Sequence, residues 1–106
     1  MATDARDRSD TPVELSAATH DFLKALASPT RQRIMLLFAR GAELSVNEVA
    51  DLAGIGQSTA SQQLDLLRRA RIVTSRRDGK TVFYRADTQG STAALAELQA
   101  YLQNCC

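Results

Sequence analysis

A chain of 106 residues is long enough for one small domain, and its 44% of hydrophobic residues can bury only a modest core. It has no run of 18 apolar residues and no charged, apolar start of the kind that directs secretion, so we expect a cytoplasmic location. With one histidine, no pair of carboxylates in an apolar setting and no nucleophile motif, the chain is not expected to be an enzyme.

The formal net charge of +1 hides an uneven distribution along the chain. Residues 57–87 contain seven cationic and three acidic side chains, whereas residues 1–14 and 88–106 are both net acidic. A concentration of positive charge is what contact with DNA phosphates requires. Charge alone is equally compatible with an ordinary solvated basic face. The predicted helices and strands that carry the charge are needed to distinguish a DNA-binding surface from such a face.

The first part of the chain predicts an arm and two helices. Residues 1–14 are polar and alternate in charge, and we expect them to form a disordered N-terminal arm. Apolar residues spaced three and four apart favour a first helix over 16–27. A second helix is expected over 29–40, where a serine cap precedes proline at the first helical position and a glycine follows the end. Its centre, residues 34–38, is apolar on nearly every side, which predicts the most buried element.

A helix-turn-helix is indicated in the middle of the chain. Ser45 and Glu48 have the spacing of a capping box, which favours the start of a short third helix over 46–53. A turn with two glycines follows at 54–56, and a fourth helix begins at residue 57 or 58. Two short helices joined by a glycine-containing turn are typical of this DNA-binding motif.

The last third of the chain predicts a hairpin and a terminal helix. β-branched and aromatic runs at 72–73 and 82–84 flank Asp78-Gly79, a dipeptide that strongly favours a hairpin turn. The pattern of residues 88–104 predicts an amphipathic helix. At the end of so small a domain, such a helix often packs against a partner molecule. Residues 15–104 should therefore form a mainly α fold with a small β-hairpin wing, that is, a winged helix-turn-helix of about five helices and two strands.

Four motifs, in this order, resemble the ArsR/SmtB family of bacterial winged-helix regulators. Each alone would be a weak signal, but four in sequence are specific, and the resemblance covers about residues 15–104. It implies a homodimer with the first and last helices at the dimer interface, and a fourth helix that enters the major groove of DNA. The motifs are KALASPTRQRI at 24–34, ELSVNEVA at 43–50, QSTASQQL at 57–64 and RRDGKTVFYR at 76–85.

The chain also departs from the family pattern. Gln62 and Gln63 stand where a histidine pair is frequent, Arg71 stands where a glycine is frequent, and Gly56 replaces a more usual serine. These differences are compatible with the expected fold. They leave the operator sequence unpredictable.

The residues that would contact DNA lie on three elements. Gln62 and Gln63 are the expected base readers, because a glutamine amide offers a donor and an acceptor together, which suits adenine in the major groove. Two-fold symmetry predicts a palindromic operator in double-stranded DNA, with half-sites about 34 Å apart or a multiple of that distance. The full set is Gln57, Ser58, Thr59, Ser61, Gln62, Gln63 and Arg68 on the fourth helix, Arg76, Arg77 and Lys80 on the wing, and Arg31 at the start of the second helix, where it could hold a phosphate.

Two metal sites that are common in the family are incomplete in this chain. One resembles a Glu-Leu-Cys-Val-Cys motif, but Ser45 and Asn47 stand at the positions of its two thiolates. The other uses aspartate and histidines of the last helix, and residues 88–104 contain no histidine.

The remaining candidate metal ligands are Cys105, Cys106 and His20. Two thiolates and an imidazole would suit zinc, nickel, copper(I) or arsenite, provided that the dimer brings the first helix near the tail. A bond between neighbouring cysteines would close a strained ring, so no disulfide is expected at rest. Thiol redox chemistry, a partner protein, another ligand or abundance alone are the alternatives for regulation.

The expected function is that of a sequence-specific DNA-binding transcriptional regulator, a dimeric repressor that responds to a metal if the cysteine site exists. One alternative is a winged-helix regulator without a metal site, controlled by thiol redox chemistry or by a partner protein. A further alternative is a protein-interaction module that kept the winged fold but acts through another protein.

Overall fold

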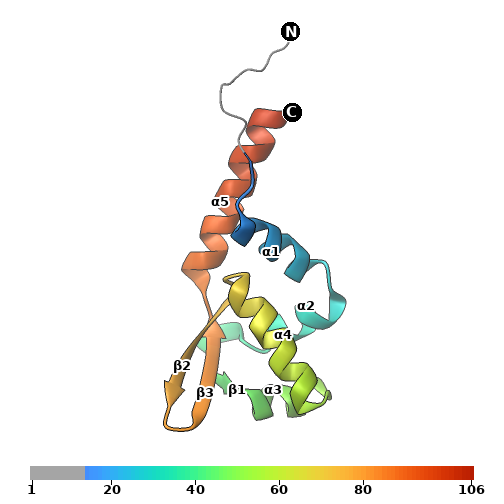
Figure 1. The fold of residues 1–106 in the computed structure, drawn as a ribbon, viewed down its shortest axis with the longest axis vertical. Helices are drawn as coiled ribbons and strands as arrows, with labels where there is room; N and C mark the ends of the chain where they lie inside the picture. Colours follow the sequence, from blue (N-terminus) through green and yellow to red (C-terminus); the bar gives the residue numbers. More distant parts are fainter. Residues whose placement is uncertain (1–13) are drawn as a thin grey trace.

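The computed structural model describes residues 14–106, so the arm expected at the N-terminus lies outside the described residues except for Glu14. Figure 1 shows α5 extending away from the β2–β3 hairpin, with α1 beside α5 and α4 in the middle of the molecule. Within residues 14–106, no helix is long and apolar enough to span a membrane. The elements are α1 (Ala17–Leu26), α2 (Pro29–Leu36), the 3-10 turn η1 (Ala39–Gly41), β1 (Leu44–Ser45), α3 (Val46–Ala53), α4 (Gln57–Arg69), β2 (Val73–Asp78), β3 (Thr81–Ala86) and α5 (Thr88–Cys105).

The mainly α fold with a hairpin wing is confirmed, but the sheet has three strands where two were expected. β1 pairs antiparallel with β3, and β3 pairs antiparallel with β2, which gives the order β1-β3-β2. The hairpin closes between Asp78 and Thr81, and Gly79 takes a φ of 63°, a left-handed conformation that suits glycine. β1 is missed from sequence because two residues directly before a helix cannot show the alternation typical of a strand.

α2 ends at Leu36, four residues before the expected end. Arg40 and Gly41 take φ values of 63° and 75°, which a right-handed helix cannot contain, so the chain turns through η1 instead. The expectation that residues 34–38 form the most buried segment is also partly wrong. Ile34 and Phe38 are buried, but Leu36 is 75% exposed, because it lies about 200° around α2 from Ile34 and so points away from the core.

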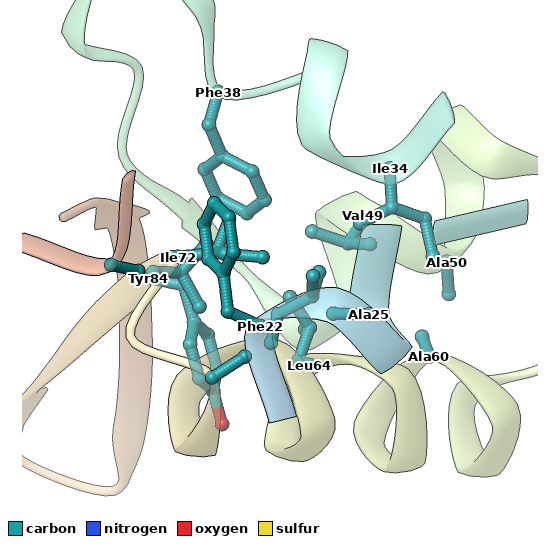
Figure 2. Close-up of a cluster of buried hydrophobic side chains, with 14 residues drawn as sticks. Phe22, Ala25, Ile34, Phe38, Val49, Ala50, Ala60, Leu64, Ile72 and Tyr84 are labelled. Carbon is teal, nitrogen blue, oxygen red and sulfur yellow. The ribbon is translucent and has the colours of Figure 1, made fainter. Parts of the chain in front are cut away.

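The core joins α1, α2, α3, α4 and the sheet in one cluster. In Figure 2, the rings of Phe22 and Phe38 lie beside Ile72, while Ile34 and Val49 occupy the other end of the cluster. The buried apolar residues are Phe22, Ala25, Ile34, Phe38, Val49, Ala50, Ala60, Leu64, Leu67, Ala70, Ile72, Val73, Tyr84 and Ala94. The core therefore holds α4 between α1 and α3, which fixes the helix expected to contact DNA.

Side-chain caps set the starts of the helices, as the sequence predicts. Ser16 and Ser28 each accept a hydrogen bond from the backbone amide three residues further on. Ser45 and Glu48 make both bonds of the capping box at the start of α3. Asp87 caps α5 in the same way, a role that its sequence context did not reveal.

Glu97 is the only charged residue of α5, and it joins this helix to the start of α1. Its carboxylate accepts hydrogen bonds from the backbone amide of Ser16 at 2.6 Å, from the Ser16 hydroxyl at 2.9 Å and from the Thr19 hydroxyl at 2.5 Å. These donors, the Thr19 hydroxyl first, hold the pKa of Glu97 below its usual range.

We expect Glu97→Gln to lower the thermal stability at neutral pH and to remove part of its acid dependence. Because the folded-state pKa is lowered, the carboxylate stabilises the fold fully above the usual glutamate pKa, and this contribution is lost as pH falls through the folded value. Melting temperatures measured from about pH 7 to about pH 3 should therefore show a gap between wild type and variant that closes on acidification. Glu14→Gln removes an exposed carboxylate and is the control. A gap that is independent of pH would contradict this role.

Candidate nucleic-acid interface

The helix-turn-helix is formed by α3, α4 and the turn between them. Gly54 ends α3 in the left-handed conformation, with a φ of 67°, and Gly56 precedes α4. Val49 of α3 and Ala60 and Leu64 of α4 are all fully buried. This packing places α3 behind α4 and leaves the opposite side of the first turns of α4 in solvent.

The exposed start of α4 is polar and carries no capping side chain. Because Gly56 is the N-cap and the first turn has no acidic residue, the backbone amides there have no side-chain acceptor from the cap. The positive end of the helix dipole and these amides favour an anion such as a phosphate. Five of the expected DNA-contacting residues are exposed on this segment: Gln57, Ser58, Thr59, Ser61 and Gln62.

Gln63 differs from its neighbour, because it is half-buried and bonded within the protein. Its Oε1 accepts a hydrogen bond from Nη1 of Arg31 at 3.1 Å. Arg31 also donates from Nε to the carbonyl oxygen of Ala25 at 3.2 Å and from Nη2 to that of Lys24 at 2.9 Å. The structure thus brings together two expected DNA contacts from separate motifs, and it gives both of them partners inside the protein.

Arg76 on β2 is likewise engaged within the protein. Its Nε and Nη2 both donate to the carboxylate of Glu43 at 2.7 Å, and its guanidinium lies 5.0 Å from the centre of the Phe83 ring. The hydrogen bond from Arg76 holds the pKa of Glu43 below its usual range. This contact joins the wing to the segment before β1. It could not be predicted from local sequence patterns, because Glu43 and Arg76 are 33 positions apart.

The cations at the end of α4 share one carboxylate. Arg68 and Arg69 approach Asp65 at 2.7 and 3.0 Å, and the hydrogen bond from Arg68 lowers the pKa of that carboxyl group. All three side chains are about half exposed, so the pairs add little stability and can exchange partners. To bind a phosphate, Arg68 would therefore have to leave Asp65, the carboxylate that it shares with Arg69.

Arg77 and Lys80 differ from Arg76 on the same wing. Both are exposed, and neither makes an ion pair within residues 14–106. Lys80 follows Gly79 in the hairpin turn, so its charge lies at the tip of the wing. Of the three wing cations expected to meet DNA, these two are available without breaking an internal contact.

The candidate metal ligands are not gathered into a site by one copy of the chain. Among the residues that the structure describes, no three His, Cys, Asp or Glu side chains lie close enough to share an ion. The expectation of two free thiols is wrong for this structure, since Cys105 and Cys106 form a disulfide with their Cα atoms 3.8 Å apart. Cys106 follows the last residue of α5, where the helical repeat no longer fixes the backbone. A metal site that combines reduced thiolates with His20 across two subunits stays a prediction.

The fold and this surface define the class of protein. A polar helix exposed at the front of a helix-turn-helix, with a cationic hairpin in the same half of the molecule, is the arrangement of a winged helix-turn-helix transcriptional regulator (Figure 1). Residues 26–76 match the helix-turn-helix domain family.

Known proteins narrow the class to one family. The biofilm growth-associated repressor of Xylella fastidiosa is 43% identical over 75 residues, which cover 71% of this chain and 64% of that protein. The transcriptional repressor SmtB of Mycobacterium tuberculosis is 38% identical over 74 residues, 70% of this chain and 54% of the relative. The crystal structure of a possible transcriptional regulator for arsenical resistance is 39% identical with a TM-score of 0.62, covering 79% of this chain and 82% of that one. The chain belongs to the ArsR/SmtB family of transcriptional regulators.

Membership in this family confirms the resemblance found in the four sequence motifs. It also agrees with the expectation of a regulator rather than an enzyme, because the relatives are named as repressors or regulators. The alignments span only 54–64% of the length of the two curated relatives, so the activity and the partners of those whole proteins do not transfer directly.

Proposed function

We propose that this chain is a homodimeric transcriptional repressor that binds a palindromic operator in double-stranded DNA. The observation that carries the proposal is the exposed and polar start of α4, which has no capping side chain and belongs to a helix that packs against α3. The wing adds Arg77 and Lys80 in the same half of the molecule (Figure 1). A cytoplasmic location, where a regulator meets its operator, belongs to the same proposal.

Each part of the interface has a proposed role in DNA binding. Gln62 is the principal base reader, because it is exposed and its amide can donate and accept at one adenine. The hydroxyls of Ser58, Thr59 and Ser61 bind phosphates or make mixed contacts that fix the register on the duplex. Arg77 and Lys80 supply affinity that depends on salt and carries no sequence information.

The dimer proposal is supported by an apolar stripe on α5. Leu95 and Leu102 are 56% and 60% exposed, and Leu98 and Tyr101 are half-buried on the same helix. Figure 1 shows the end of α5 extending beyond the body of the domain, so one copy leaves this stripe uncovered. Burial of such leucines against a second copy is favourable, and α1 carries a further exposed leucine, Leu23.

Release of the operator is proposed to depend on the two C-terminal cysteines. A disulfide between Cys105 and Cys106 favours control by thiol redox chemistry over a metal site, because bonded sulfurs are not thiolate ligands. Metal sensing therefore requires that these cysteines be reduced first.

We expect Arg77→Ala combined with Lys80→Ala to weaken DNA binding without changing sequence preference. Affinity should fall about equally for a duplex selected from a randomised library and for its scrambled version. Because the proposed dimer loses four cations, two from each copy, the slope of log K against log salt should become shallower by about 4. Fluorescence anisotropy at several salt concentrations measures both quantities. Lys24→Ala combined with Arg33→Ala removes the same charge from α1 and α2 as the control.

The same titration tests the proposed function itself. The wild type should bind the selected duplex at least about 10³-fold more tightly than the scrambled one. A wild-type protein that shows no such preference would exclude an operator-binding repressor, and it would favour the protein-interaction module instead.

A further inference from the structure

Arg31 links three helices through one guanidinium group. Two of its donors reach the carbonyl oxygens of Lys24 and Ala25 in the last turn of α1, where the helix offers no amide four residues further on. The third reaches Oε1 of Gln63 on α4. The backbone amide of Arg31 is itself held by the capping hydroxyl of Ser28 at 3.3 Å, so both ends of the residue are fixed.

This set of contacts depends on the shape of arginine. A guanidinium presents its donors in a planar fork, so it can meet three acceptors on two different helices at once, whereas a lysine ammonium is a flexible point charge. A bidentate grip on a phosphate would use the same fork and would compete with these internal bonds. The geometry therefore favours a structural use of Arg31 over the phosphate contact expected from sequence.

Gln63 of α4 is likewise engaged within the protein, as the acceptor for Arg31. Successive residues of a helix point about 100° apart, so exposed Gln62 and half-buried Gln63 face different surroundings. Reading of adenine by glutamine needs one donor and one acceptor, and the acceptor of Gln63 is already bonded to Arg31. Gln63 thus lacks the free amide face that a bidentate base reader requires.

We propose that Arg31 is a positioning residue, with Gln63 as its receptor, that fixes the recognition helix α4 against the dimerisation helix α1. This inference rests on the proposed function as a DNA-binding dimer. Because α1 belongs to the proposed dimer interface, the angle between α1 and α4 sets where each α4 lies relative to the two-fold axis. Arg31 thereby contributes to sequence discrimination and to the preferred spacing of half-sites, and it contributes nothing to phosphate affinity.

The test uses the conservative variant Arg31→Lys and the receptor variant Gln63→Met. Three duplexes are compared: one selected from a randomised library by the wild type, the same duplex with its half-sites one base pair further apart, and a scrambled duplex. Each variant should reduce the preference for the selected over the scrambled duplex about tenfold and should tolerate the altered spacing better than the wild type. Affinity for the scrambled duplex and the salt slope should not change. The double variant should be no worse than Arg31→Lys alone, because both single changes remove the bond between Arg31 and Gln63.

A matched control removes a similar bond that does not reach α4. Gln32 is the next residue of α2, and its Nε2 donates to the carbonyl oxygen of Leu26 at 2.6 Å. Gln32→Met should leave the preference for the selected duplex intact. Gln63→Met keeps the bonds from Arg31 to α1, so it should fold even if Arg31→Lys does not, and melting curves identify that case.

The possible outcomes separate this inference from the proposed function. If Arg31→Lys binds all three duplexes as the wild type does, Arg31 is a simple cationic contact and the inference is wrong. If Gln63→Met changes the preference at a single base position while Arg31→Lys does not, Gln63 is a base reader and the inference is also wrong. A wild type that enriches no duplex from the library would instead contradict the proposed function.

Discussion

Gly90→Ala is expected to destabilise the folded chain by about 2–3 kcal/mol, a large effect for the addition of one methyl group. A Cβ at this position would lie 2.5 Å from the carbonyl oxygen of Arg71, 2.7 Å from Oδ2 of Asp87 and 2.8 Å from Cβ of Arg71. The first of these neighbours is backbone, which cannot rotate away as a side chain can. The first turn of α5 would therefore have to shift as a unit.

Several hydrogen bonds oppose such a shift. The amide of Gly90 is bound by the capping carboxylate of Asp87 at 2.8 Å, and the amide of Asp87 donates to the carbonyl oxygen of Ile72 at 2.8 Å. On the other side, the amide of Ile72 donates to the carbonyl oxygen of Leu67. The start of α5 and the turn after α4 are thus fixed to each other, and Gly90 leaves no room for a Cβ between them.

Urea denaturation followed by circular dichroism measures this effect, with Gly56→Ala as the matched control. Gly56 has a φ of −67°, which alanine adopts readily, and a Cβ there would meet no atom within 4 Å. Gly56→Ala should change the free energy of unfolding by less than about 1 kcal/mol, because the gain from a less flexible unfolded chain is opposed by the preference for glycine over alanine at an N-cap. Equal stability of the two variants would show that α5 is not closely seated on the turn after α4.

The turn after α4 also shows how far the sequence could predict this fold. Arg71 has a φ of 62°, which explains why a glycine is frequent at its position in the family: a residue without Cβ adopts this conformation at no steric cost. Capping residues, glycine turns and the Asp-Gly hairpin act over a few positions, so their effects on the ends of helices and strands were predictable. The end of α2 was not, because a run of apolar residues suggests continuation and cannot reveal the positive φ of Arg40.

The contacts that decide the roles of the cationic residues lie beyond local sequence patterns. Arg31 meets Gln63 and Arg76 meets Glu43 across 32 and 33 positions, and both arginines would be read as free cations from their neighbours alone. Arg77, one position from Arg76, has no such partner within residues 14–106. The charge of the segment was therefore predictable, but which of its cations remain available for phosphates depends on tertiary pairing.

Leu95→Glu combined with Leu102→Glu is expected to convert the dimer into a monomer and to reduce affinity for a two-half-site operator by about 10²–10⁴-fold. Both leucines lie on the uncovered stripe of α5, so the change should cost one folded copy little. In the proposed dimer, the same substitutions would bury carboxylates without partners, which disfavours association strongly. Loss of the dimer removes the gain that comes from binding two half-sites with one molecule.

Sedimentation velocity and anisotropy titrations on duplexes with one or two half-sites measure this prediction. Ala96→Glu combined with Ala100→Glu adds the same charge to exposed positions on another face of α5, and it should leave both the dimer and the operator affinity unchanged. The monomeric variant should bind a single half-site as weakly as the wild type does, because the tip of the wing and the exposed start of α4 lie at the opposite end of the molecule from the free end of α5 (Figure 1). A variant that remains dimeric would mean that α5 is not the main dimer contact. A monomer that keeps full operator affinity would mean that DNA is bound by one copy, and it would remove the two-fold symmetry on which a palindromic operator depends.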